Sequence, residues 1–253
     1  MSLQSAPSLP SVPAAGPSSG PSSPRPVASA VDSDLVAVPR RRTAVLVVAA
    51  TVMLNAAFTV LGSVLGYPDV LAEPAADVLA LVDAHRTQVV TWFALLTAGA
   101  LLIAPIALGL APAVDLRWRR ASVVLGVAAA IAQAIGLSRW VWLVPFLADH
   151  PTADDEQTYR LAATVLGTGL GETTGYLLTA AWTVTLCLGA RALLPAALRW
   201  AGVACAAAIA VGALVPLDVP GADTVNFIGY VAWSVWLLVL AGRILWLRRG
   251  RIA

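Results

Sequence analysis

Arg139 and Glu172 are ionisable residues that lie deep within long apolar stretches of the sequence. Charged side chains in such surroundings are costly, so they mark either a function or a specific structural pair. Counted along a helix, Arg139 lies roughly 13 Å and Glu172 roughly 16 Å from the same end of their consecutive stretches. These matched depths predict an arginine–carboxylate ion pair. A ligand or proton site that contains Glu172 is the functional alternative.

Aromatic and polar residues accompany the two charges at helical spacing. Tyr176 shares the helical face of Glu172, Trp140 and Trp142 flank Arg139, and Asn226, Tyr230 and Trp233 follow one another in a later apolar stretch. Together they outline a pocket with one acid, one cation and several aromatic rings. Helix packing or contact with lipid is the alternative for such an aromatic stripe. The candidate ligand-binding residues are Arg139, Trp140, Trp142, Glu172, Tyr176, Asn226, Tyr230 and Trp233.

The composition explains what must position these residues. Of the 253 residues, 59% are hydrophobic and 12% are charged, whereas a soluble domain carries roughly 25% charged residues. So much apolar surface cannot be hidden in one soluble core, so lipid must be the solvent. Every basic residue is an arginine. With abundant Ala, Val, Leu and Gly, this favours a GC-rich bacterial genome.

Six apolar stretches are each long enough for a membrane span of about 20 residues. They predict an all-α integral membrane protein with a bundle of six transmembrane helices in residues 40–253. The spans are expected near 43–66, 88–113, 121–147, 161–189, 198–217 and 224–246.

Arginines at alternate joints predict the orientation, because arginine near short loops stays cytoplasmic. On one side lie Arg40, Arg41, Arg42, Arg117, Arg119, Arg120, Arg191, Arg199, Arg243, Arg248, Arg249 and Arg251. The other joints carry only Arg86 and Arg160, beside ten acidic residues. Both termini are therefore expected in the cytoplasm of a bacterial cell, with the protein in its plasma membrane.

Two segments outside the spans have their own character. Residues 1–39 are rich in Ser, Pro, Ala and Gly without an apolar face, which predicts a disordered cytoplasmic tail. After Pro74, residues Ala75, Val78, Leu79 and Val82 recur at helical spacing. They predict a short helix in the membrane interface of the first outer loop.

Glycines in the fourth stretch favour close helix packing. Gly167, Gly171 and Gly175 recur every four residues, and such a stripe lets a neighbouring helix approach. Gly62 and Gly66 repeat this spacing in the first stretch.

Several kinds of site are not expected. Cys187 and Cys205 lie in apolar stretches without a CxxC pair and are interpreted as small buried residues. No zinc, phosphate-loop or nucleophile-elbow motif occurs, so we predict no cofactor and no nucleic-acid partner. Asp149, His150 and the acids at 154–156 could ligate a metal, but a solvated acidic loop is the favoured interpretation.

Several motifs together resemble an uncharacterised bacterial multi-pass family classed as a domain of unknown function. They are Gly66-Tyr67-Pro68-Asp69-Val70-Leu71, Gly136-Leu137-Ser138-Arg139-Trp140, Gly169-Leu170-Gly171-Glu172 with Gly175-Tyr176, and Asn226-Phe227-Ile228-Gly229-Tyr230 with Trp233 and Trp236. The resemblance covers roughly residues 45–246 and implies a six-span fold without an activity. Relatives often carry a histidine after the glutamate, where this chain has Thr173, which argues against a proton relay.

Three hypotheses for function follow. The first is binding or movement of a small lipophilic or amphipathic molecule in a pocket of the outer leaflet, with Arg139 and Glu172 as polar anchors. The second is an intramembrane acid catalyst acting on an isoprenoid-type substrate, in the manner of a terpene cyclase. Its acid would be Glu172, Asp69 or Asp218, with aromatic faces to stabilise carbocations. The third is a structural or assembly partner in the membrane.

Overall fold

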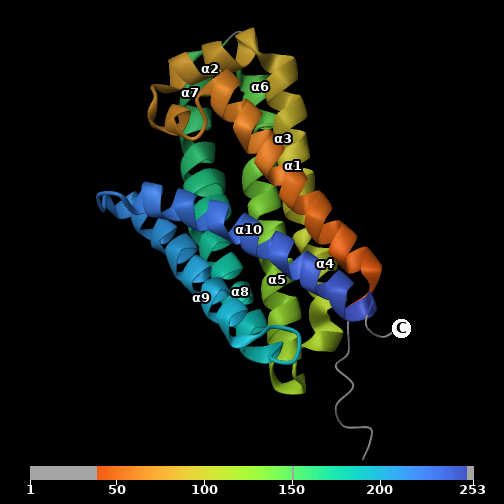
Figure 1. The fold of residues 1–253 in the computed structure, drawn as a ribbon. Helices are drawn as coiled ribbons and strands as arrows, with labels where there is room; N and C mark the ends of the chain where they lie inside the picture. The colour runs from red at the N-terminus through yellow and green to blue at the C-terminus, as the bar shows by residue number, and fades with distance from the viewer. Residues whose placement is uncertain (1–38, 150, 250–253) are drawn as a thin grey trace, which may run out of the picture. The chain divides into compact units, whose positions relative to one another are not determined.

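The computed structural model describes residues 39–149 and 151–249, and every secondary-structure element in these ranges is helical (Figure 1). Apart from Pro39, the predicted tail lies outside the described residues. The helices are α1 (Arg41–Leu65), η1 (Asp69–Ala72), α2 (Ala75–Ala84), α3 (Arg86–Leu101), α4 (Ile103–Leu110), η2 (Ala111–Ala113), α5 (Leu116–Ser138), α6 (Leu143–Leu147), α7 (Ala153–Ala162), η3 (Ala163–Thr174), α8 (Gly175–Gly189), α9 (Ala196–Val211), η4 (Gly212–Leu217) and α10 (Ala222–Arg249).

Prolines set the positions at which three long helices change course. Proline has no N–H to donate to the carbonyl four residues earlier, and its ring clashes with that carbonyl. Pro105 follows the end of α3 at Leu101, Pro145 follows the break after α5, and Pro216 follows the change from α9 to the 3₁₀ helix η4 at Gly212. The stretches predicted as single spans at 88–113, 121–147 and 198–217 are therefore each interrupted, the first near its middle and the other two nearer their C-terminal ends.

Five helical segments are long and apolar enough to cross a membrane: Arg41–Leu65, Arg86–Ala113, Leu116–Leu147, Ala196–Leu217 and Ala222–Arg248. They match the first, second, third, fifth and sixth predicted spans. The fourth predicted span, 161–189, falls on the consecutive helices α7, η3 and α8. These have 10, 12 and 15 residues, so none of them alone is long enough to cross a membrane. Figure 1 shows these three running from the end of the bundle that holds α2 towards the opposite end.

The helices from α1 to α10 form a closed ring. α1 packs against α3, α3 against α5, α5 against α8, α8 against α9, and α9 against α10, which returns to pack against α1. Two clusters of buried residues fill this ring. One includes Trp182, Trp233 and Leu237, and the other joins α1, α2 and α3 to Trp140 and Tyr159. The predicted site residues are divided between them, because Trp140 belongs to the second cluster, whereas Trp233 belongs to the first and Tyr176 and Tyr230 pack against it.

The short helix predicted after Pro74 is confirmed as α2. Its buried residues are Ala75, Val78, Leu79 and Val82, the same four that the apolar spacing indicates. They pack into the cluster that contains Trp140. A location in the membrane interface stays a prediction.

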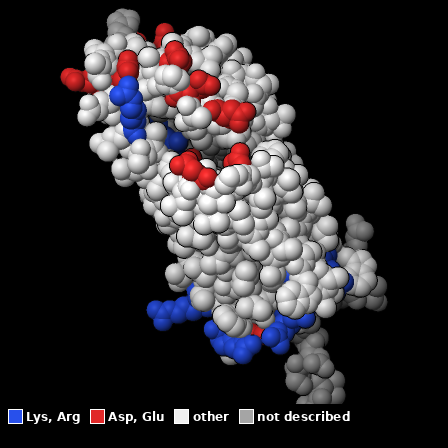
Figure 2. Space-filling model, turned by 90° about the vertical axis from the view of Figure 1, so that its left-hand side faces the viewer, with Lys and Arg blue, Asp and Glu red and all other residues white. Residues whose placement is uncertain are grey.

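Charges separate along the bundle. Figure 2 shows most of the acidic side chains gathered over one end of this face, with a few arginines among them, and the other arginines at the opposite end. We call these the acidic end and the basic end. The acidic end carries the joints at 66–85, 148–160 and 218–223, whose exposed acids include Asp69, Glu73, Asp218 and Asp223. The two sets of joints sorted by arginine in the sequence are thus also separated in space.

Candidate functional site

Arg139 is buried at the end of α5, with a relative exposure of 3%. Its Nη1 donates a hydrogen bond to the Gly136 carbonyl oxygen at 2.5 Å, and its guanidinium carbon lies 5.4 Å from the centre of the Trp140 ring. Its Nε has no hydrogen-bond partner within 39–149 and 151–249. An arginine held in this way keeps donor capacity for a further partner.

Glycines make room for this arginine. A Cβ on Gly167 would lie 2.6 Å from Arg139 Nη2, so any side chain there would displace the guanidinium. A Cβ on Gly136 would lie 2.5 Å from the Gly171 Cα, which shows how closely α5 and η3 approach. Gly175 similarly packs on Gln133. The packing role predicted for the stripe of Gly167, Gly171 and Gly175 is confirmed.

The equivalent interpretation of Gly62 and Gly66 is wrong. Gly66 caps the C-terminus of α1 with φ +67°, and no atom lies within 4 Å of the Cβ it lacks. The left-handed conformation, which glycine adopts without strain, is the physical reason for Gly66.

Glu172 lies on η3, which is a π-helix, and its side chain is half-buried. Thr174 Oγ1 donates to the Gly169 carbonyl oxygen five residues earlier, at 2.8 Å, and this bond supports the wider turn. π-helical turns are rare and often lie at functional sites. The apolar pattern of residues 161–189 predicts an ordinary α-helix, so the π-helix is seen only in the structure.

The predicted ion pair between Arg139 and Glu172 is not formed. All ion pairs among the described residues involve Arg86 or Arg160. The break after α5 explains the difference, because the guanidinium turns back to the Gly136 carbonyl and the Trp140 ring instead of reaching Glu172. The calculation of depth assumed a continuous helix through residue 147.

Tyr67 brings the two charges into one neighbourhood. Burial raises the pKa of the Tyr67 phenol, the Glu172 carboxylate raises it further, and Arg139 opposes both effects. Burial also raises the pKa of Tyr159, and Arg139 again acts in the opposite direction. Arg139 packs on Gly167, and Glu172 follows Gly167 by five residues, about one turn of a π-helix, so the two charges lie in one region although they form no ion pair. Tyr67 was not among the candidate site residues, although it belongs to the family motif at residues 66–71.

Aromatic rings enclose the Arg139 side of this neighbourhood. Trp140 is fully buried and stacks on Phe93, with ring centres 4.8 Å apart. Tyr67 and Tyr159 meet Trp140 edge-on at 6.5 and 6.3 Å. By contrast, Trp142 is 60% exposed and lies on the outer surface, so the structure separates it from the other candidate residues.

A polar seam lies between α5, α8 and α10. Gln133 Nε2 donates to Thr179 Oγ1 at 2.9 Å and to the Tyr230 hydroxyl at 3.1 Å. The Tyr230 ring lies 5.5 Å from the ring of Tyr176 and 6.0 Å from that of Trp233. The structure thus brings three predicted aromatic residues together, around Gln133, a residue the sequence analysis missed. An amide within an apolar helix is the signal that could have identified it.

Asn226 and Trp233 use their donors within the bundle. Asn226 Nδ2 donates to the Ile209 carbonyl oxygen at 2.7 Å, and Trp233 Nε1 donates to Thr183 Oγ1 at 3.0 Å. Both side chains are buried, and these bonds join neighbouring helices. Their observed contacts are therefore structural.

The other candidate acids lie at the surface. Asp69 begins η1 and Asp218 follows η4, and both are exposed. No group of three potential metal ligands occurs in the described part of the chain, although His150 lies outside it. Asp155 instead forms a capping box with Thr152 at the start of α7, and the hydrogen bonds from Thr152 lower the pKa of its carboxyl.

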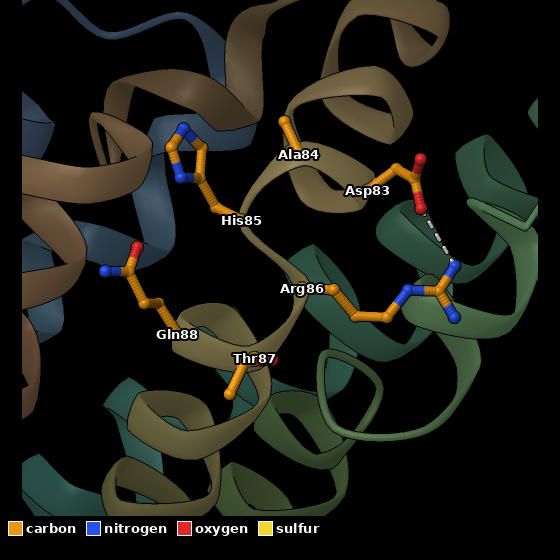
Figure 3. A pocket seen from close by; sticks show the side chains of 6 residues that line it. All are labelled: Asp83, Ala84, His85, Arg86, Thr87 and Gln88. Atoms are coloured by element: carbon orange, nitrogen blue, oxygen red, sulfur yellow. Dashed lines mark hydrogen bonds and ion pairs between the residues drawn. The ribbon is translucent and has the colours of Figure 1, made fainter.

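A pocket of about 370 Å³ lies where α2 turns into α3, and it is lined by residues 83–88 (Figure 3). Figure 3 shows His85 and Gln88 on one side and the Asp83–Arg86 ion pair on the other. This ion pair has an Asp83 Oδ1 to Arg86 Nη2 distance of 3.0 Å. None of the predicted site residues lines this pocket.

The apolar helices, the ring and the separated charges define a membrane protein with membrane-spanning helices. Residues 43–241 match the family described as "Domain of unknown function (DUF4386)", and the chain belongs to this family. The expected resemblance to an uncharacterised family is thereby confirmed. Neither the comparison with curated proteins nor that with solved structures finds a match.

Proposed function

We propose that this chain crosses the bacterial plasma membrane six times, with both termini in the cytoplasm, and binds a small amphipathic molecule near its acidic end. The fourth span, 161–189, consists of the end of α7 followed by η3 and α8. The support for this orientation is the spatial separation of arginines from acids, because arginine-rich joints stay cytoplasmic.

Reporter fusions test the topology. Fusions after Gly250 and near residue 115 are expected to report the cytoplasm, and a fusion near residue 154 is expected to report the outside. A cytoplasmic signal at 154, or an external signal at 115, would contradict the six-span proposal. A fusion after Arg42 provides the matched control at the other cytoplasmic end.

One observation carries the binding proposal: the buried Arg139 guanidinium packs on Gly167 of η3, the π-helix that also carries Glu172, yet neither charge forms an ion pair with a described residue. Taking a charge out of water costs several kcal/mol unless a partner compensates. Groups arranged for stability alone would meet each other, as the sequence analysis expected. Two uncompensated charges beside aromatic rings are better explained as anchors for a molecule that binds there.

The variants Arg139→Met and Glu172→Gln test the binding role. Each replacement removes a charge that no described ion pair compensates, so neither is expected to lower the free energy of unfolding by more than about 1 kcal/mol. Each should also remove an amphipathic molecule that co-purifies with the wild-type chain, as measured by native mass spectrometry. Trp142→Ala, on the outer surface, is the control that should retain it. Equal retention by all variants, or a wild-type chain that binds no added amphiphile, would contradict the proposal.

A further inference from the structure

We propose that the bound molecule carries a zwitterionic head, in which an ammonium group lies beside a phosphate or carboxylate. This inference rests on the binding role proposed above and assigns its chemical class. Arg139 is the partner of the acidic group, and Glu172 is the partner of the ammonium group.

The Arg139 side requires an acceptor. Arg139 has a relative exposure of only 3%. Its Nη1 donates to the Gly136 carbonyl oxygen, and its Nε has no hydrogen-bond partner among the described residues. Guanidinium groups bind phosphate and carboxylate oxygens through parallel N–H donors. An acidic group of the guest would complete this donor set.

The Glu172 side requires a cation. Glu172 is half-buried, no ion pair with a described residue neutralises it, and it lies about one turn along η3 from Gly167, which packs on the Arg139 guanidinium. A partly buried carboxylate without an ion-pair partner is a favourable environment for an ammonium group, because opposite charges attract more strongly away from bulk water. A guest with both groups satisfies both charges at once.

The acidic end disfavours a guest with net negative charge. Figure 2 shows a hollow in this face with acidic side chains on both sides and arginine beside it, and in the described residues the acids at this end outnumber the arginines. η4 packs against η3, so the exposed Asp218 that follows η4 lies close to the π-helix that carries Glu172. Such a field repels anions and admits a molecule with zero or positive net charge.

Four probes with the same oleoyl or oleyl chain separate the alternatives: lysophosphatidylethanolamine (zwitterion), lysophosphatidic acid (anion), oleylamine (cation) and monoolein (neutral). Each is titrated into the full chain in delipidated detergent solution, and the dissociation constant is measured by native mass spectrometry and by thermal shift. The zwitterion is expected to bind at least about tenfold more tightly than the other three, since the anion and the cation each leave one charge unmatched and monoolein leaves both.

The variants should change this preference in opposite ways. In Arg139→Met, oleylamine should bind as tightly as the zwitterion, and in Glu172→Gln, lysophosphatidic acid should do so. The Trp142→Ala control should keep the wild-type preference. Competition by water-soluble O-phosphoethanolamine would support the same head chemistry from a free source, whereas its failure to compete would support a membrane lipid as the source.

Two outcomes overturn the inference and are distinguishable. If one singly charged or neutral probe binds as tightly as the zwitterion to the wild-type chain, the zwitterion is wrong but the binding role stands. If no probe binds, water alone bridges the two charges, and both the inference and the proposed function are wrong.

Discussion

Gly136→Ala is expected to lower the free energy of unfolding by about 2–3 kcal/mol, because the added methyl group would overlap backbone atoms. A Cβ at this position would lie 2.5 Å from the Gly171 Cα and 2.8 Å from the Leu166 carbonyl oxygen. Backbone atoms cannot turn away as a flexible side chain can, so α5 and η3 would have to separate. Thermal unfolding in detergent measures the effect.

Gly242→Ala is the matched control, because Gly242 also lies within a helix but has no atom within 4 Å of an added Cβ. Alanine is a better helix former than glycine, so this variant is expected to be as stable as the wild type or up to about 1 kcal/mol more stable. Equal melting temperatures for the two variants would show that α5 and η3 do not approach as described.

Trp140→Ala is expected to lower the free energy of unfolding by about 3 kcal/mol or more, because it removes a fully buried ring and leaves a cavity. Trp140 stacks on Phe93 and meets Tyr67 and Tyr159 edge-on, so the change also removes three aromatic contacts. It should weaken binding at the proposed site as well, since the Arg139 guanidinium rests against this ring.

Trp142→Ala removes the same side chain two residues later and is the control for this prediction. Because Trp142 is 60% exposed, its loss should change the free energy of unfolding by less than about 1 kcal/mol. A large loss of stability for Trp142→Ala with little for Trp140→Ala would mean that the two rings point the opposite way from that described.

Much of the fold could be predicted from local patterns. The length of the apolar stretches predicted all five described segments that are long and apolar enough to cross a membrane. The spacing of Ala75, Val78, Leu79 and Val82 predicted the buried face of α2. Helical periodicity is a property of neighbouring residues, so it can be read along one segment. Pro105, Pro145 and Pro216 each follow a helix interruption within a few residues, so these prolines could also have been used to predict the interruptions.

The candidate site was less predictable. Arg139 and Trp140 are buried and Glu172 and Tyr176 are half-buried, whereas Trp142 is exposed; a binding role for these residues stays a prediction. Two residues along a helix turn the side chain by about 200°, so adjacent candidates of this kind cannot both face one pocket. Tyr67 and Gln133 entered only through contacts with distant segments.

The sequence by itself determined that lipid is the solvent, where the apolar segments lie, and which joints carry arginine or acid, because these follow from composition and order along the chain. Only the tertiary structure decided that Arg139 turns to the Gly136 carbonyl and Trp140, that η3 widens into a π-helix against α5, and that Glu172 stays unpaired in the described residues. The direction of a side chain after a helix break depends on the neighbouring helices, and matched depth along two helices does not specify it.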